Sequence, residues 1–158
     1  MTLLFPFLLI WQAVGAPPPP ARVTASVRRI FGAEATAIPL PAGAATVLRV
    51  ARADTLLGFA LVRAVKGKDQ PITFLVAIDT ADRLKDIDIL VYREPYGGEV
   101  AYEAWRRQFR GKSAQDTLEV GRQIRSISGA TISVNAVTLG VRRALQNLTT
   151  WHRNGVIK

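Results

Sequence analysis

The chain contains no cysteine and only one histidine, His152. The lack of cysteine excludes disulfide bonds, a lipidated signal segment, iron–sulfur clusters held by thiolates and covalently attached haem. His152 lies in the polar stretch after the last predicted helix, so we interpret it as a solvated residue and not as a catalytic base. An electron relay through thiolate-held centres within the chain is therefore excluded.

Charge is missing from the first part of the sequence, because no Lys, Arg, Asp or Glu precedes Arg22. Residues 3–16 form a mostly apolar run. The run is shorter than the roughly 20 residues of a membrane-spanning helix and has the length of the hydrophobic part of a signal peptide. Small residues near its end suit cleavage after Gly15, although a basic leader is lacking. We predict a signal peptide or N-terminal anchor over residues 1–16, with a buried N-terminal element as the alternative.

This segment indicates an extracytoplasmic protein, periplasmic or membrane-associated on the outer side of the inner membrane. A stiff proline-rich linker at residues 17–21 is expected to follow it. The 158-residue chain then has room for one ordinary domain, which we place at residues 22–150. We expect the polar tail at residues 151–158 to fray.

The predicted domain carries a positive excess, with 21 Lys and Arg against 12 Asp and Glu in the whole chain. The basic stretch over residues 106–112 is an example. Such charge usually solvates one face of a protein, and it can also attract an acidic partner or an anionic surface. Aspartates also gather around a predicted hairpin: Asp79, Asp82, Asp86 and Asp88. Their spacing does not match a calcium-binding loop, so we interpret them as solvated turn carboxylates.

Apolar patterning and turn residues predict an α+β domain, with an antiparallel sheet of about four or more strands flanked by helices. The predicted strands are residues 46–53, 57–65, 72–79 and 87–93, and a turn at residues 80–83 joins the last two. Helices are predicted at residues 22–32, around residues 102–111 and at residues 133–148. The proline-containing residues 33–45 are predicted to be a loop, and residues 112–127 a loop with one short strand.

The most informative motif is Ser128-Gly129-Ala130-Thr131, directly before the predicted C-terminal helix. The unpaired N–H groups and the dipole at a helix N-terminus favour an anion such as phosphate. Gly129 would let a ligand approach the backbone closely. The same residues also suit a tight turn in which Thr131 or Ser133 caps the helix. From residue chemistry alone, helix capping is the simpler interpretation.

With two further segments, this motif resembles the FMN-binding domain family, found in the RnfG and NqrC subunits of membrane redox complexes and in small exported flavoproteins. Residues 92–98 resemble the family's Glu-and-Gly loop after the central hairpin, and residues 105–112 resemble the segment that follows that loop. The resemblance covers roughly residues 55–148. Together the segments are far more specific than the four-residue motif.

The resemblance implies that Thr131 carries FMN through a phosphoester bond made by a separate flavin transferase. It assigns no catalytic residue and no metal, and it implies these other cofactor-binding residues: Ser128, Gly129, Ala130, Ser133, Glu94, Gly97 and Gly98. Tyr96 and Trp105 are candidate neighbours of the flavin ring, although such aromatics are more often core residues. Arg125 stands where the family usually has Asp, which leaves noncovalent FMN binding open, or assistance by Arg125 in neutralising a phosphate.

The resulting hypothesis is an exported FMN-binding electron-transfer protein, an electron carrier more than a stand-alone enzyme. Its expected partners are the flavin transferase, redox proteins or small redox carriers, and a membrane; no specific nucleic acid is expected. The alternative is a module that binds FMN noncovalently, or another anion, without a redox role. A third interpretation is a basic exported protein that attaches nonspecifically to nucleic acid or to an anionic envelope surface.

Overall fold

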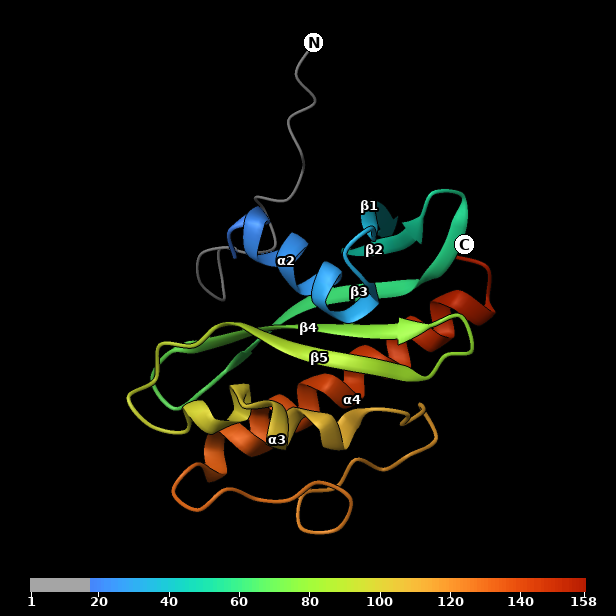
Figure 1. Cartoon of the computed structure of the whole chain (residues 1–158). Coiled ribbons are helices and arrows are strands. Elements are labelled where there is room, and N and C mark those ends of the chain that lie inside the picture. Colours follow the sequence, from blue (N-terminus) through green and yellow to red (C-terminus); the bar gives the residue numbers. More distant parts are fainter. Residues whose placement is uncertain (1–17) are drawn as a thin grey trace.

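The computed structural model describes residues 18–158, which form an antiparallel sheet of five strands with helices on both faces (Figure 1). The strands are paired in sequence order: β1 (Thr36–Ala42), β2 (Ala45–Arg52), β3 (Thr55–Lys66), β4 (Pro71–Asp79) and β5 (Leu84–Val91). The helical elements are α2 (Pro20–Phe31), η1 (Gly98–Ala101), α3 (Glu103–Arg106), η2 (Arg107–Phe109) and α4 (Thr131–Arg153). The predicted α+β class and antiparallel sheet are confirmed.

The signal or anchor segment predicted over residues 1–16 lies outside the described residues, as does the first residue of the predicted linker. Across the part of the chain that the structure describes, no helix combines the length and the apolar character needed to cross a membrane.

Strand β1 is an edge strand in a stretch that the sequence predicted to be a loop. Its Pro39 and Pro41 lie opposite Leu48 and Thr46 of β2, and within residues 18–158 no strand pairs with the other side of β1. Because proline has no N–H to donate, it is tolerated on a strand that is hydrogen-bonded along one edge only. The loop prediction was therefore wrong for Thr36–Ala42.

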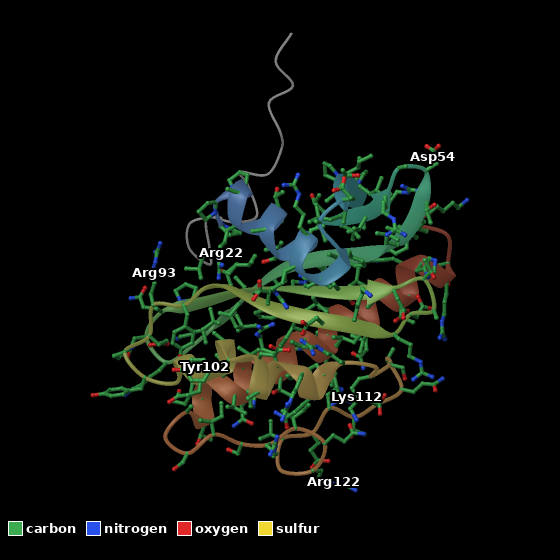
Figure 2. The ribbon with its side chains drawn as sticks, viewed as in Figure 1. Arg22, Asp54, Arg93, Tyr102, Lys112 and Arg122 are labelled. Atoms are coloured by element: carbon green, nitrogen blue, oxygen red, sulfur yellow. The ribbon has the colours of Figure 1, made fainter. Side chains whose placement is uncertain are left out.

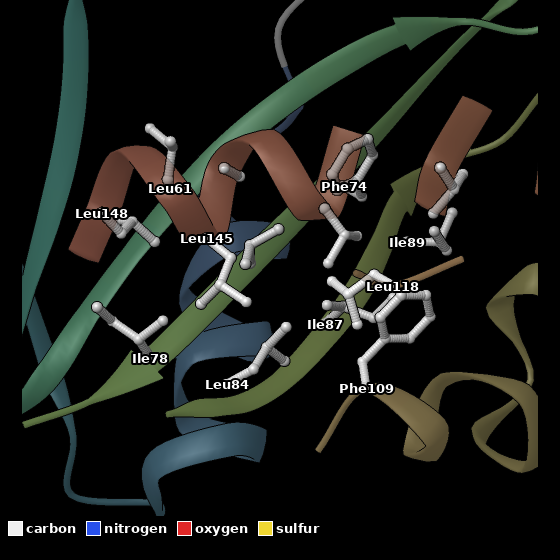
Figure 3. Close-up of a cluster of buried hydrophobic side chains, with 14 of the residues drawn as sticks. Leu61, Phe74, Ile78, Leu84, Ile87, Ile89, Phe109, Leu118, Leu145 and Leu148 are labelled. Carbon is white, nitrogen blue, oxygen red and sulfur yellow. The ribbon is translucent and has the colours of Figure 1, made fainter. Parts of the chain in front are cut away.

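Strand β4 is buried along nearly its whole length because a helix covers each face of the sheet there (Figure 1). Alternate side chains point to opposite faces, so Phe74 and Ile78 pack in the core beneath α4, while Leu75 packs in the smaller core beneath α2. Figure 3 shows the first of these cores, where Leu145 and Leu148 of α4 meet the sheet. Each such side chain contributes about 1.5–3 kcal/mol by leaving water, so the cores hold both helices firmly on the sheet.

Helix α4 crosses the sheet so that its first turn lies at the end where β5 leaves the sheet and the chain enters η1 (Figure 1). The connection before α4 contains an isolated bridge between Val120 and Ile124, and among the described residues it forms no named strand. The short strand predicted within residues 112–127 was therefore wrong.

The C-terminal residues are more ordered than the sequence predicted. Helix α4 continues to Arg153, past its predicted end, and Ile157 is only 1% exposed. His152 Nδ1 lies 2.6 Å from Asp82 Oδ1, and the His152 ring lies 5.0 Å from the ring of Phe59. The expectations of a fraying tail and a solvated His152 were wrong, because Asp82 is distant in sequence but adjacent in space.

Candidate functional site

The Ser-Gly-Ala-Thr motif forms a tight turn that leads directly into α4. The Ala130 N–H donates to the Ile127 carbonyl at 3.1 Å, and Gly129 has a φ of 78°, which suits the third position of a type II turn. The helix begins at Thr131. This confirms that the motif opens the C-terminal helix.

No side chain of the described residues caps the start of α4. Ala130 occupies the N-cap position and has no side chain that can accept a hydrogen bond. Thr131 is exposed, whereas Ser133 is buried and bonded elsewhere. The capping interpretation of Thr131 and Ser133 was therefore wrong. The N–H groups of the first turn have no acceptor within the helix, so they can stabilise a bound anion.

The glycine loop after β5 lies directly against the start of α4. Gly97 has a φ of 87°, in the left-handed region that favours glycine. A Cβ at this position would lie 2.7 Å from Tyr92 Oη and 3.1 Å from both Ala130 Cβ and Ser133 Oγ. A larger residue would therefore push the loop away from the helix.

Tyr92 ties the glycine loop to the helix. Its hydroxyl donates a hydrogen bond to the Tyr96 carbonyl and shares another, 2.9 Å long, with Ser133 Oγ. Tyr92 is half-buried and Ser133 is buried, so little water competes for the bond between them. Through this one side chain, the loop and the first turn of α4 form a single unit.

A hollow of about 260 Å³ opens between the glycine loop and the motif. It is lined by Pro95, Tyr96, Gly97, Gly98, Glu99, Tyr102, Ser128 and Gly129. Tyr96 and Tyr102 are 80% and 64% exposed, so both rings stand at its rim. Tyr102 and Arg93 mark this end of the molecule in Figure 2. Ligand sites usually measure roughly 300–1,000 Å³, so the hollow suits part of a larger ligand and leaves the rest outside.

Glu94 lies beside the hollow but directs its carboxylate elsewhere. Its Oε1 accepts hydrogen bonds from the backbone N–H groups of Asp69 at 2.8 Å and Gln70 at 3.1 Å, in the turn between β3 and β4. Desolvation raises the pKa of Glu94, but hydrogen bonds from the backbone around Gln70 outweigh it and hold the pKa below its usual value. Glu94 thus anchors the loop to the sheet.

Trp105 is a core residue and does not wall the hollow. It is 5% exposed, and its Nε1 donates to the Arg125 carbonyl at 2.8 Å. Gln108 Oε1 accepts from the Arg125 N–H at 2.8 Å, so two side chains fix the backbone just before the motif. The Arg125 side chain itself is exposed. Arg125 therefore keeps a positive charge in solvent, three residues before Ser128.

The aspartates near the turn between β4 and β5 are mostly buried. Asp86 is 4% exposed, and its Oδ2 lies 2.9 Å from Arg29 Nη1 and 3.0 Å from Arg110 Nη2. Burial raises the pKa of Asp86, but the hydrogen bonds from these arginines outweigh it and leave the pKa below its usual value. Asp82 and Asp88 are also paired with basic side chains. For all three, the prediction of solvated turn carboxylates was wrong.

Arg106 belongs to the same cluster and supports one wall of the hollow. It is 7% exposed, its Nε donates to the Ala101 carbonyl at 2.8 Å, and its Nη1 donates to the Ile87 carbonyl at 2.7 Å. These bonds fix the end of η1 to β5. The prediction of a solvated basic face was therefore wrong for Arg106. No group of side chains among residues 18–158 is arranged to hold a metal ion.

The structure brings together most of the predicted site. Ser128, Gly129, Gly97 and Gly98 line the hollow, Thr131 is exposed beside it, and Ala130 and Ser133 lie under the glycine loop. Glu94 supports the loop from its other side. Sequence reasoning gave no role to Tyr92, Glu99 or Tyr102. Their proximity to the conspicuous Gly97-Gly98 pair was the available signal. The family resemblance grouped that glycine pair with residues 128–129, whereas residue chemistry alone did not.

Comparisons with known proteins indicate the family to which the chain belongs. A family model described as "FMN-binding domain" matches residues 67–146, about half of the chain, which include both the glycine loop and the motif. The chain is also 33% identical over 94 residues to the G subunit of the proton-translocating ferredoxin:NAD(+) oxidoreductase complex of Clostridium ljungdahlii (strain ATCC 55383 / DSM 13528 / PETC). This match covers 54% of the chain and 50% of that protein. The chain thus spans about half the length of this curated relative.

Proposed function

This chain belongs to the FMN-binding domain family and uses FMN as its cofactor; from that premise we propose that it is an exported electron carrier with FMN held by a phosphoester bond to Thr131. One observation carries the proposal. Thr131 is exposed at the first position of α4 and lies beside the hollow lined by Ser128 and Gly129. No side chain in the described part of the chain caps this helix start.

The electrostatics of this position suit a phosphodiester. Such a group keeps one negative charge, and the dipole and free N–H groups of a helix N-terminus favour a negative charge there. Thr131 would supply the oxygen of the ester. Its activation has to come from outside, because threonine is a weak nucleophile and the only histidine, His152, lies at the opposite end of α4. This supports a separate flavin transferase as the maturation partner.

The other proposed cofactor-binding residues divide by position. Gly97, Gly98, Ser128 and Gly129 would contact the flavin nucleotide where they line the hollow. Ala130 and Ser133 would support the loop from below, and Glu94 would hold it from the sheet. Tyr96 and Tyr102 offer aromatic rings at the rim. Since the hollow is small, one face of the flavin ring would stay open to a redox partner.

When bound, FMN supplies one- and two-electron chemistry, while the protein supplies attachment, orientation and the local electrostatic field. An electron-carrier role is supported by the name of the relative, which belongs to a ferredoxin:NAD(+) oxidoreductase complex. The same name supports redox proteins as partners, and the apolar residues 3–16 support export or membrane association. We propose no substrate chemistry for the chain alone.

The test is to co-express the full chain with a flavin transferase, denature it, and measure flavin fluorescence and intact mass. Covalent attachment predicts fluorescence that stays with the denatured chain and a mass increase equal to one FMN ester. The Thr131→Ala variant should lose both and remain folded. Thr150→Ala changes an exposed threonine near the other end of the same helix and should lose neither.

Two other outcomes are informative. Flavin that is present in the native protein but leaves on denaturation would establish noncovalent FMN, in agreement with Arg125 at the family's Asp position. A label that persists in Thr131→Ala would place the attachment elsewhere. If the protein binds FMN but no donor can reduce this FMN and no acceptor can oxidise it, the carrier role is refuted and the binding role stands.

A further inference from the structure

Helix α4 presents an exposed stripe that begins at Thr131. Along it, Ile132 and Leu139 are 52% and 46% exposed, and the exposed Arg142 and Arg143 follow on the next turn. These residues recur at the spacing that keeps side chains on one side of a helix. With a rise of 1.5 Å per residue, Leu139 lies about 12 Å and Arg142 about 16 Å from Thr131 along the axis. We name Ile132, Leu139, Arg142 and Arg143 the α4 stripe.

Exposed apolar side chains gather at this end of the molecule. The large exposed hydrophobic residues of the described chain are Ile38, Tyr96, Tyr102, Ile132, Leu139 and Val156. Two of them are in the α4 stripe, and Tyr96 and Tyr102 stand at the rim of the adjacent hollow. A single exposed apolar residue needs no explanation, but apolar residues grouped beside a site are typical of an interaction surface.

The charge of the stripe is positive and unopposed. Helix α4 contains no Asp or Glu. The salt bridges found among residues 18–158 do not include Arg142 or Arg143. Arg29 and Arg110, by contrast, are engaged with the buried Asp86. The guanidinium groups of the stripe can therefore act on a partner instead of on their own chain.

The other exposed helix lacks this combination. Helix α2 also has no acidic residue in its sequence and exposes Arg28, but none of the large exposed hydrophobic residues lies on it. Its Arg22 and Arg29 are bonded to β5. Of the two helices, only α4 combines exposed apolar residues, arginines outside the salt bridges and proximity to Thr131. Helix α2 therefore serves as the control surface for α4.

We propose that the α4 stripe is the docking surface for an acidic redox protein; this rests on the function proposed above. The partner would present an apolar patch to Ile132 and Leu139, and carboxylates to Arg142 and Arg143. Docking would bring its redox centre to the end of α4 that carries Thr131. In the exchange no bond forms or breaks: a reduced partner loses one electron to the FMN of the loaded protein, or an oxidised partner gains one.

The kinetic test uses a reduced acidic ferredoxin as the probe and the FMN-loaded full chain. We expect Arg142→Glu with Arg143→Glu to lower the second-order rate by about tenfold or more at low salt and to abolish the decrease of that rate with added salt. Ile132→Ser with Leu139→Ser should lower the rate several-fold at every salt concentration. The control, Arg28→Glu with Arg52→Glu, reverses two exposed charges outside α4 and should change the rate far less.

Photoreduced deazariboflavin, a small neutral reductant, separates docking from loading. All variants should react with it as the unmodified protein does, because it needs no docking surface. A slow reaction with this reagent or a lack of loaded flavin would count against the proposed function. The docking proposal would be overturned if the stripe and control variants react with ferredoxin at equal rates. This conclusion requires that all variants load flavin and react with the small reductant normally.

A second arm needs no flavin. Amide resonances of ¹⁵N-labelled, flavin-free chain should shift along the α4 stripe when oxidised ferredoxin is added at low salt, and the stripe variants should lose these shifts. Shifts confined to α2, or none at all, would overturn the proposal. Shifts on α4 caused by vesicles of anionic lipid but not by ferredoxin would also overturn it, because the stripe would then be a membrane surface.

Discussion

Replacing Gly97 by alanine tests whether the glycine loop is pressed against the start of α4. Two costs are expected. The φ of 87° places the new Cβ in the left-handed region, which costs an L-residue roughly 1–2 kcal/mol. That Cβ would also lie 2.7 Å from Tyr92 Oη, so Tyr92 has to move away from its hydrogen bond to the buried Ser133. An unpartnered buried hydroxyl costs about 1–3 kcal/mol.

The sum predicts a loss of roughly 2–5 kcal/mol in the free energy of unfolding. For a chain of this size, the melting temperature should fall by roughly 4–20 °C. Covalent FMN loading should fall as well, because the loop that walls the hollow would move away from Ser128 and Gly129. Both quantities are measurable on the same preparations, by thermal unfolding of flavin-free protein and by bound fluorescence after co-expression.

Two further glycines separate the costs. Gly129 has a φ of 78°, but a Cβ at this position would meet open space, so Gly129→Ala should cost only the backbone term of about 1–2 kcal/mol. Gly98 has neither a strained φ nor a close neighbour, so Gly98→Ala should stay within about 0.5 kcal/mol. The expected order of destabilisation is Gly97, Gly129, Gly98. Equal effects of Gly97→Ala and Gly129→Ala would refute the close contact between loop and helix.

Three other changes test the supports of the site. Tyr92→Phe should cost roughly 1–2 kcal/mol in urea unfolding, because Ser133 Oγ loses its partner; an unchanged midpoint would contradict this. Asp86→Asn should cost roughly 1.5–3 kcal/mol in urea unfolding, because Arg29 and Arg110 lose the buried carboxylate but keep Asp88 and Glu103 as partners. Asn at the exposed Asp54 should have little effect. The pKa of Glu94 is lowered, so its ionised carboxylate stabilises the fold above pH 4.5, and this stabilisation is lost as the pH falls further. The difference in unfolding free energy between the unmodified protein and Glu94→Gln should therefore become smaller as the pH falls below 4.5.

The elements that the sequence predicted well are those whose pattern is local. Strand β4 was recognisable as a continuous apolar run between turn residues. Helix α4 was recognisable because Val134, Val137 and Val141 recur at helical spacing, and all three are fully buried. Strand β1 was not recognisable, since Pro39 and Pro41 argue against a strand unless it is known to lie at an edge.

From residue chemistry alone the site was predictable only in its parts, and it was the family resemblance that grouped those parts into one site. The motif around Thr131 and the Gly97-Gly98 pair stand out in the sequence, yet the hollow depends on their meeting across the fold. Asp86 looked like a turn residue because its partners, Arg29 and Arg110, lie far away along the chain. Sequence patterns indicate which residues are unusual, whereas tertiary contacts decide which of them act together.

The rotation of α4 about its own axis explains why the Thr131 hydroxyl is accessible and the Ser133 hydroxyl is not. Thr131 and Ser133 are two residues apart, which turns their side chains by about 200° around the helix axis. The buried Val134 and Val137 fix the rotation of the helix on the sheet, and this rotation turns Ser133 inward to Tyr92 and Thr131 outward. The same rotation places Leu139 and Arg142 on the outward side. Core packing thus selects both the proposed anchor for FMN and the surface on which a partner would meet it.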